Sequence, residues 1–125
     1  MNKQYSVLVI EDDPSLLDIC KIVLDAGGYR VSTATNGLEG IAAIKANMPD
    51  LILLDLYMPV MNGREFLRNF NKDDFPDIKI IVYSNASEKD ITSEMLELGA
   101  DDVVLKSSVS PRELNDLVGR MVARD

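Results

Sequence analysis

The chain has 125 residues, with 13 basic and 21 acidic side chains, a net charge of −8, no histidine and one cysteine. Without histidine it can form neither a Ser-His-Asp nor a Cys-His nucleophile system, and a lone cysteine excludes a disulfide framework. Its acidity disfavours direct nucleic-acid binding, which needs clustered Lys and Arg. No uncharged stretch approaches the about twenty residues of a membrane span, and nothing at the start resembles a signal peptide. We therefore expect a soluble, cytoplasmic, single domain over residues 1–125.

Short apolar runs alternate along the chain with longer segments of helical period. The first, third and fourth runs are nearly continuously apolar, as in central strands that helices cover on both faces. The expected strands are Ser6–Ile10, Tyr29–Thr33, Leu51–Leu54, Lys79–Tyr83 and Asp102–Leu105. Strict alternation of five strands with five helices predicts an α/β fold, in which helices cover both faces of a parallel sheet.

Apolar spacing and polar start signals predict the five helices. The first helix follows Asp13-Pro14, and its apolar positions are Leu16, Ile19, Cys20, Val23 and Leu24. The fourth helix is expected from Ser87 to Leu98. Helix starts are also predicted at Asn36 with Glu39, Asn62 with Glu65, and Ser110 with Glu113. Gly27-Gly28 and Gly99 are stop signals.

Candidate reactive side chains follow four of the five expected strands, at the sheet edge where open α/β folds bind ligands, whereas the uncharged Thr35-Asn36 follows the second strand. These candidates are Glu11, Asp12 and Asp13 after the first strand, Asp55 after the third, Ser84 after the fourth and Lys106 after the fifth. If the strand order is 2-1-3-4-5, the acidic groups converge where the first and third strands adjoin. Carboxylates this close repel each other unless protons or a cation intervene. A divalent cation such as Mg²⁺, bound by carboxylates and water, is the usual solution.

These residues together suit phosphoryl transfer. Asp55 is the candidate nucleophile, forming an aspartyl phosphate. Lys106 supplies a positive charge for phosphate oxygens, and Ser84 supplies a hydroxyl donor. Simpler explanations are also available. Asp12 or Asp13 could be a helix cap, Lys106 a solvated lysine and Ser84 a turn residue, and a lone aspartate such as Asp55 at the end of a strand is ordinary. Because all four strand ends fit one chemistry, we favour the functional interpretation.

Four segments resemble the response-regulator receiver domain of two-component signalling, and the resemblance covers essentially the whole chain. They are VLVIEDDP at 7–14, LDLYMPVMNG at 54–63, IIVYS at 80–84 and GADDVVLK at 99–106. The resemblance implies a flavodoxin-like, doubly wound five-stranded parallel sheet in the order 2-1-3-4-5. It also implies a phosphoacceptor rather than a turnover enzyme. The phosphoryl group would come from a sensor histidine kinase or a histidine phosphotransfer protein.

The resemblance assigns a role to each matching residue. Asp55 corresponds to the phosphorylated aspartate, and Ser84 and Lys106 match the family's hydroxyl and lysine. The implied ligands of Mg²⁺, with Mn²⁺ as an alternative, are Asp12 directly, Glu11 through water, Asp55 and the backbone carbonyl of Tyr57. Phosphorylation is implied to change the surface of helix four, strand five and helix five. That face would contact a downstream target, an output domain or a second copy in a dimer.

Three positions depart from the family's pattern. Asn85 stands where a small residue is usual; it either crowds the phosphoryl group, which we favour, or donates an amide hydrogen bond to it. Val103 replaces a rotating Tyr or Phe, so we expect Ser84 and helix four to carry the signal. Ser107 replaces a proline whose preceding bond is typically cis. A cis bond before serine costs about 3–4 kcal/mol, so we expect Lys106–Ser107 to be trans.

Two other functions stay open. A pseudo-receiver would be a phosphorylation-independent interaction module, which the three departures favour and the five intact site residues oppose. A flavodoxin-like cofactor binder would need a Ser, Thr or Gly phosphate loop after the first strand, where this chain has Glu11-Asp12-Asp13-Pro14. Tyr57 and Ala86 occupy positions that tune hydrolysis in the family, and Tyr57 either shields the phosphoryl group or is only a loop aromatic.

Overall fold

A computed structural model describes residues 4–85 and 91–123, and within these ranges five parallel strands form one sheet. Their order is β2-β1-β3-β4-β5, as predicted. The strands are β1 (Ser6–Ile10), β2 (Arg30–Ala34), β3 (Leu51–Leu54), β4 (Lys79–Ser84) and β5 (Asp102–Leu105). The prediction of β2 is one residue early, because β1 pairs with Arg30 through Ala34.

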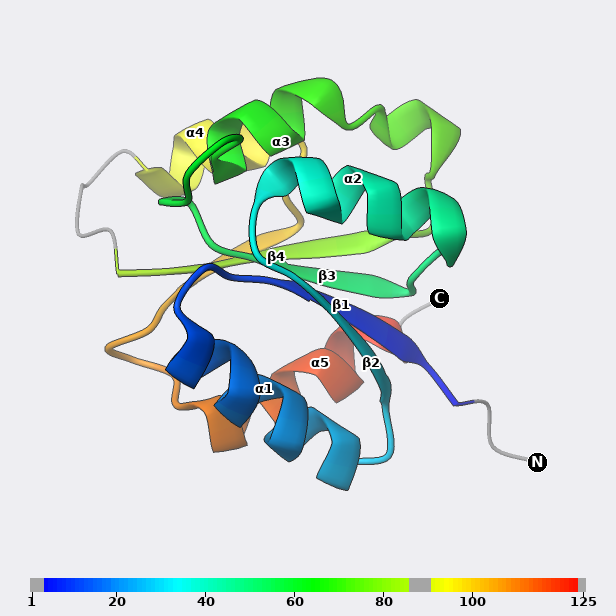
Figure 1. The fold of residues 1–125 in the computed structure, drawn as a ribbon, viewed down its shortest axis with the longest axis vertical. Coiled ribbons are helices and arrows are strands. Elements are labelled where there is room, and N and C mark those ends of the chain that lie inside the picture. Colours follow the sequence, from blue (N-terminus) through cyan, green and yellow to red (C-terminus); the bar gives the residue numbers. More distant parts are fainter. Residues whose placement is uncertain (1–3, 86–90, 124–125) are drawn as a thin grey trace.

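Two layers of helices cover the sheet (Figure 1). α1 (Pro14–Ala26) and α5 (Pro111–Val122) lie on one face, and α2 (Gly37–Ala46), α3 (Gly63–Asn69) and α4 (Ile91–Glu97) on the other. The short 3-10 helix η1 (Lys72–Asp74) was not predicted. The predicted start of the fourth helix at Ser87, like Ala86, lies outside the described residues. No helix in the described part of the chain is long and apolar enough to cross a membrane.

The sheet separates two apolar cores. Val7 and Val9 face α1 and α5, whereas Leu8 and Ile10 face α2, α3 and α4, because successive side chains of a strand point to opposite faces. All four residues of β3 are at most 2% exposed. The predicted apolar strands are therefore central strands covered on both sides.

Polar side chains fix the helix starts that lie beside the site. Asp13 caps α1, and its carboxylate accepts a hydrogen bond from the Ser15 N–H at 3.0 Å. The simpler explanation for Asp13 is thus confirmed. Asn62 and Ser110 each form a full capping box at the start of α3 and α5. These caps hold the helix ends against the loops that follow the strands.

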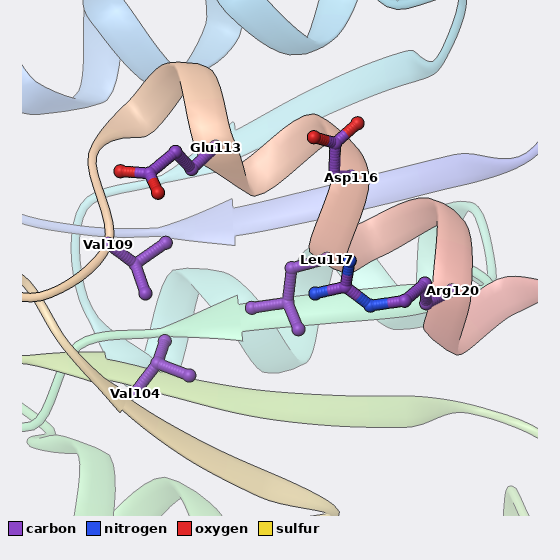
Figure 2. Close-up of a pocket in the computed structure, with 6 residues that line it drawn as sticks. All are labelled: Val104, Val109, Glu113, Asp116, Leu117 and Arg120. Atoms are coloured by element: carbon purple, nitrogen blue, oxygen red, sulfur yellow. The ribbon is translucent and has the colours of Figure 1, made fainter.

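A pocket of about 260 Å³ lies between β5 and α5 (Figure 2). Val109 reaches it from the loop that leads into α5. The other lining residues are Val104, Glu113, Asp116, Leu117 and Arg120. The pocket therefore combines apolar walls with charges of both signs.

Candidate functional site

Backbone hydrogen bonds between strand ends form the base of the site. The Asp55 N–H donates to the Ile10 carbonyl at 3.0 Å, which fixes the end of β3 beside the end of β1. The Lys106 N–H donates to the Ser84 carbonyl at 2.9 Å, which joins the ends of β4 and β5 in the same way. Asp55, Ser84 and Lys106 therefore come from three neighbouring strands.

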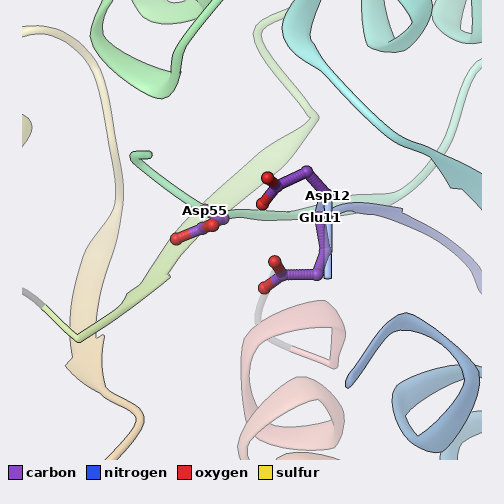
Figure 3. A group of neighbouring side chains, drawn as sticks. All are labelled: Glu11, Asp12 and Asp55. Carbon is purple, nitrogen blue, oxygen red and sulfur yellow. The ribbon is translucent and has the colours of Figure 1, made fainter. Parts of the chain in front are cut away.

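The carboxylates of Glu11, Asp12 and Asp55 form an acidic cluster, as predicted (Figure 3). One oxygen of each lies within 4.8 Å of the others. Glu11 is 4% exposed and Asp55 is 6% exposed, whereas Asp12 is exposed to solvent. Asp12 therefore marks the open side of the cluster. Tyr57 lies in the loop after β3 with a half-exposed ring, and the metal-ligand role of its carbonyl stays a prediction.

Lys106 reaches this cluster from the end of β5. Its Nζ lies 2.7 Å from Glu11 Oε1 and 3.5 Å from Asp55 Oδ1. The other Glu11 oxygen, Oε2, accepts a hydrogen bond from the Asp13 N–H at 3.1 Å. Lys106 is thus a paired, largely buried lysine, which is contrary to the solvated alternative.

Burial is the main influence on the ionisation of this ion pair. Desolvation raises the pKa of the Glu11 carboxyl above its ordinary value, although the Lys106 hydrogen bond opposes the rise. Burial alone would lower the pKa of Lys106, but the hydrogen bond to Glu11 and the charge of Asp55 outweigh it, and the pKa is raised. The ammonium group therefore stays charged at neutral pH. The cluster of three carboxylates thus has one ammonium group, bound to two of them, and its excess negative charge favours a cation.

The donor set fits a hard divalent cation. Mg²⁺ is usually bound by one or two carboxylates together with water. Asp12 is exposed, and it lies beside the more buried Asp55. Both Glu11 oxygens already accept hydrogen bonds, so a water-mediated role suits Glu11 better than direct ligation. The residues present are therefore compatible with the predicted Mg²⁺ site.

The structure describes all three positions that depart from the family pattern. The described residues contain no cis peptide bond, so Lys106–Ser107 is trans, as expected. Val103 is partly buried and packs against the core on the α4 side. Asn85 is exposed at the end of β4, and Ser84 is 1% exposed.

Two side chains near the site were not predicted to contribute. Tyr83, which precedes Ser84, donates its hydroxyl to the Val109 carbonyl at 2.6 Å. Arg64 on α3 makes two hydrogen bonds to Glu94 on α4, at 2.9 and 3.1 Å. The phenol in an otherwise apolar strand was a visible signal, because a buried Tyr hydroxyl usually has a partner. The partner itself lies 26 residues away and had no sequence signal.

Comparisons with known proteins place this geometry in a family. Residues 7–119 match the family described as "Response regulator receiver domain". "Probable C4-dicarboxylate response regulator DctR" of Bacillus subtilis (strain 168) is 41% identical over 106 residues, covering 83% of this chain and 46% of that protein. "Response regulator SaeR" of Staphylococcus aureus (strain USA300) is 35% identical over 119 residues, covering 92% and 51%. The chain thus spans about half the length of these curated relatives.

Solved structures agree with the sequence comparison. The CheY-like response regulator receiver domain protein from Methanospirillum hungatei JF-1 has a TM-score of 0.87 at 29% identity, covering 97% of this chain and 95% of that one. CheY4 of Vibrio cholerae, a chemotaxis response regulator, has a TM-score of 0.85 at 26% identity, covering 95% and 99%. The flavodoxin-like fold is therefore confirmed, and this chain belongs to the response regulator receiver domain family.

Proposed function

We propose that this domain accepts a phosphoryl group on Asp55 from the phosphohistidine of a sensor histidine kinase or a histidine phosphotransfer protein, in a reaction that requires Mg²⁺ or Mn²⁺. The strongest support is the buried Lys106 ammonium, which lies against both Glu11 and Asp55 at the carboxyl edge of the sheet. Membership of the receiver family supports the same role.

In this reaction a carboxylate oxygen of Asp55 attacks phosphorus, and the P–N bond to the donor imidazole breaks. The electron pair of that bond stays on the imidazole nitrogen, so nothing is oxidised or reduced. Among the described residues, the contacts of Asp55 involve Oδ1, which accepts the Leu56 N–H at 2.8 Å and faces Lys106. We therefore assign the attack to Oδ2.

The other site residues stabilise the transferred group. The Lys106 ammonium balances negative charge on the phosphoryl oxygens, and the Ser84 hydroxyl donates a hydrogen bond to one of them. A bound Mg²⁺ would neutralise further charge on those oxygens. Before the reaction Glu11 keeps the ammonium beside Asp55. Cys20 is not a competing nucleophile, because burial raises the pKa of its thiol to about 11.

Incubation with acetyl phosphate and Mg²⁺, followed by intact-mass spectrometry, tests this function. We expect wild-type protein to gain one phosphoryl group, and the gain to disappear in Asp55→Asn and with EDTA. Asp77→Asn is a matched control, because Asp77 is an exposed aspartate that precedes β4 at the opposite edge of the sheet. A folded wild-type protein that gains no mass with Mg²⁺ or Mn²⁺ would instead support the phosphorylation-independent pseudo-receiver, which Val103 and Ser107 favour.

We further propose that α4, β5 and α5 form the surface that contacts a downstream target, an output domain or a second copy in the cytoplasm. Leu96 on α4 is 45% exposed, and the pocket between β5 and α5 adds apolar and charged groups (Figure 2). We expect beryllofluoride with Mg²⁺ to promote self-association in sedimentation velocity runs, and Leu96→Asp to prevent it. Association that is equally strong in Leu96→Asp would place the interface elsewhere.

A further inference from the structure

We propose that Tyr83 is a positioning residue for Lys106, which it holds through the turn between β5 and α5. The inference rests on the proposed transfer to Asp55, in which the Lys106 ammonium balances charge on the phosphoryl group. The Tyr83 hydroxyl is bound to the Val109 carbonyl, and among the described residues it makes no hydrogen bond with Asp55. Its effect on the reaction would therefore act through the position of the lysine.

Tyr83 lies on the strand, and on the face of the sheet, that the Lys106 side chain crosses. β4 lies between β3, which carries Asp55, and β5, which carries Lys106. The Tyr83 ring lies in the core that faces α1 and α5, as do Val9 and Leu53. Glu11 and Asp55 follow those two residues by two positions, so the alternation of strand side chains directs them to the same face.

Lys106 must therefore extend across β4 to reach the acidic cluster. Its Nζ lies 5.9 Å from the centroid of the Tyr83 ring. At this distance the face of an aromatic ring attracts a cation. The ammonium group thus lies over the Tyr83 ring and is also bound by the carboxylates of Glu11 and Asp55.

The hydroxyl of the same residue fixes the turn from which Lys106 extends. It donates to the Val109 carbonyl at 2.6 Å. The N–H groups of Ser108 and Val109 both donate to the Leu105 carbonyl, at 3.0 and 3.1 Å, so residues 105–109 form one compact turn. Tyr83 is 4% exposed, and a buried hydroxyl is costly without a partner. The hydrogen bond therefore stabilises the turn, because a turn that moved away would leave the buried hydroxyl without a partner.

Ser107 makes this support more important. A proline at that position would fix its own φ angle covalently, whereas serine leaves it free. The turn after Lys106 consequently depends on noncovalent contacts. Tyr83 supplies one such contact to the turn and a second to the lysine itself.

The direct test is Tyr83→Phe, which keeps the ring and removes the hydroxyl. We expect phosphorylation by acetyl phosphate at saturating Mg²⁺ to slow about three- to tenfold, as for the loss of one buried hydrogen bond. Mg²⁺ affinity should stay within about twofold of wild type, because the ligand carboxylates make no contact with the hydroxyl. In a variant that was only less stable, the phosphorylation rate and the Mg²⁺ affinity would fall together.

Tyr29→Phe is a matched control. It also removes a tyrosine hydroxyl that donates to a backbone carbonyl of α5, that of Asn115 at 3.4 Å. Tyr29 immediately precedes β2, at the sheet edge opposite the site. Its rate of phosphorylation should equal that of wild type.

A double-mutant cycle tests whether the effect passes through the lysine. In a Lys106→Ala background, Tyr83→Phe should cause no further slowing. The inference is overturned if Tyr83→Phe reacts at the wild-type rate while folded, if it slows the Lys106→Ala protein equally, or if Mg²⁺ affinity falls in parallel with the rate.

The position of the ammonium can also be observed without phosphorylation. In ¹⁵N-labelled protein the Lys106 ammonium resonance, assigned by its loss in Lys106→Ala, should shift or broaden in Tyr83→Phe and not in Tyr29→Phe. An unchanged resonance would overturn the inference. If wild-type protein accepts no phosphoryl group but this resonance responds as expected, the proposed function fails and the positioning by Tyr83 stands.

Discussion

Gly63, the first residue of α3, lies directly against the backbone that follows β3. A Cβ atom there would lie 2.5 Å from the Asp55 carbonyl oxygen and 2.8 Å from Leu56 Cα. The Gly63 N–H also donates to the Leu56 carbonyl at 2.9 Å. Backbone atoms cannot rotate out of the way as a side chain can. The start of α3 and the segment that follows β3 can therefore approach this closely only with glycine at 63.

We expect Gly63→Ala to destabilise the domain by about 1–3 kcal/mol, as overpacking does, and to slow phosphorylation because Asp55 is displaced. Urea unfolding and the acetyl phosphate assay measure the two effects. Gly119→Ala is the control, since its Cβ would meet only the Tyr29 hydroxyl at 3.1 Å. A Gly63→Ala protein that is as stable and as reactive as Gly119→Ala would contradict this account.

Val60 is strained in the loop between β3 and α3. Its φ is +67°, which a β-branched residue rarely adopts. The Met61 N–H donates to the Pro59 carbonyl at 2.7 Å, so Val60 is the central residue of a γ-turn. The side chain is 74% exposed and contributes little packing that could offset the strain.

Val60→Gly should therefore stabilise the domain by about 1 kcal/mol, after the greater flexibility of unfolded glycine is subtracted from the relieved strain. Urea unfolding measures the change. Val60→Ala keeps a Cβ at positive φ and should gain less. Equal gains from both substitutions would point to another cause.

At the scale of elements, one ion pair joins α3 to α4 on the surface of the domain. Arg64 binds Glu94 with two hydrogen bonds, and Tyr57 is one of the groups that raise the pKa of the Arg64 guanidinium. The Arg64 hydrogen bond is the main reason that the pKa of Glu94 is lowered. The helix that we expect to carry the signal is thus tied to the loop that follows Asp55.

The lowered pKa sets the pH range in which this pair acts. Its contribution is fully present above the unfolded-state pKa, near 4.5, and is lost as the pH falls through the lower folded-state pKa. We expect Glu94→Gln to lower the melting temperature at pH 7, and the difference from wild type to shrink as the pH falls below the unfolded-state pKa. Glu97→Gln, also on α4, is the control. A difference that persists undiminished in acid would exclude the ion pair as its source.

Local sequence signals predicted the elements better than the contacts between them. The caps at Asn36, Asn62 and Ser110 were correct, because a cap depends on residues three positions apart. The 3-10 helix η1 was missed because three residues are too few to show a period. The convergence of Glu11, Asp12 and Asp55 followed from the strand order alone.

The missed contacts join residues far apart in the chain. Arg64 and Glu94 are 30 residues apart, and no periodicity pairs them. The binding of Lys106 to Glu11 depends on how far a flexible side chain extends across β4, which the strand order does not specify. The roles of Ser84 and of the Tyr57 carbonyl stay predictions.

At the scale of the whole molecule, the net charge of −8 is unevenly distributed, because part of it is concentrated in the acidic cluster. A cation that binds this cluster should stabilise the folded state. We expect Mg²⁺ at ten times its dissociation constant to add about 1.4 kcal/mol to the free energy of unfolding. Thermal melts with Mg²⁺, against NaCl of equal ionic strength, measure this gain.

Asp12→Asn gives the matched comparison, because Asp12 is exposed and its replacement leaves the core intact. The variant should lose most of the Mg²⁺-dependent gain. A full gain in Asp12→Asn would show that Mg²⁺ binds elsewhere on the domain.

The hydrogen bond between Lys106 and Glu11 closes a loop of chain, since the two residues are 95 positions apart. Contacts of such long separation form only after most of the intervening chain has been ordered. During refolding, helical circular dichroism should therefore recover before the capacity of Asp55 to react. A partly folded chain would be a poor phosphoryl acceptor, and the signal would be restricted to molecules that have completed folding.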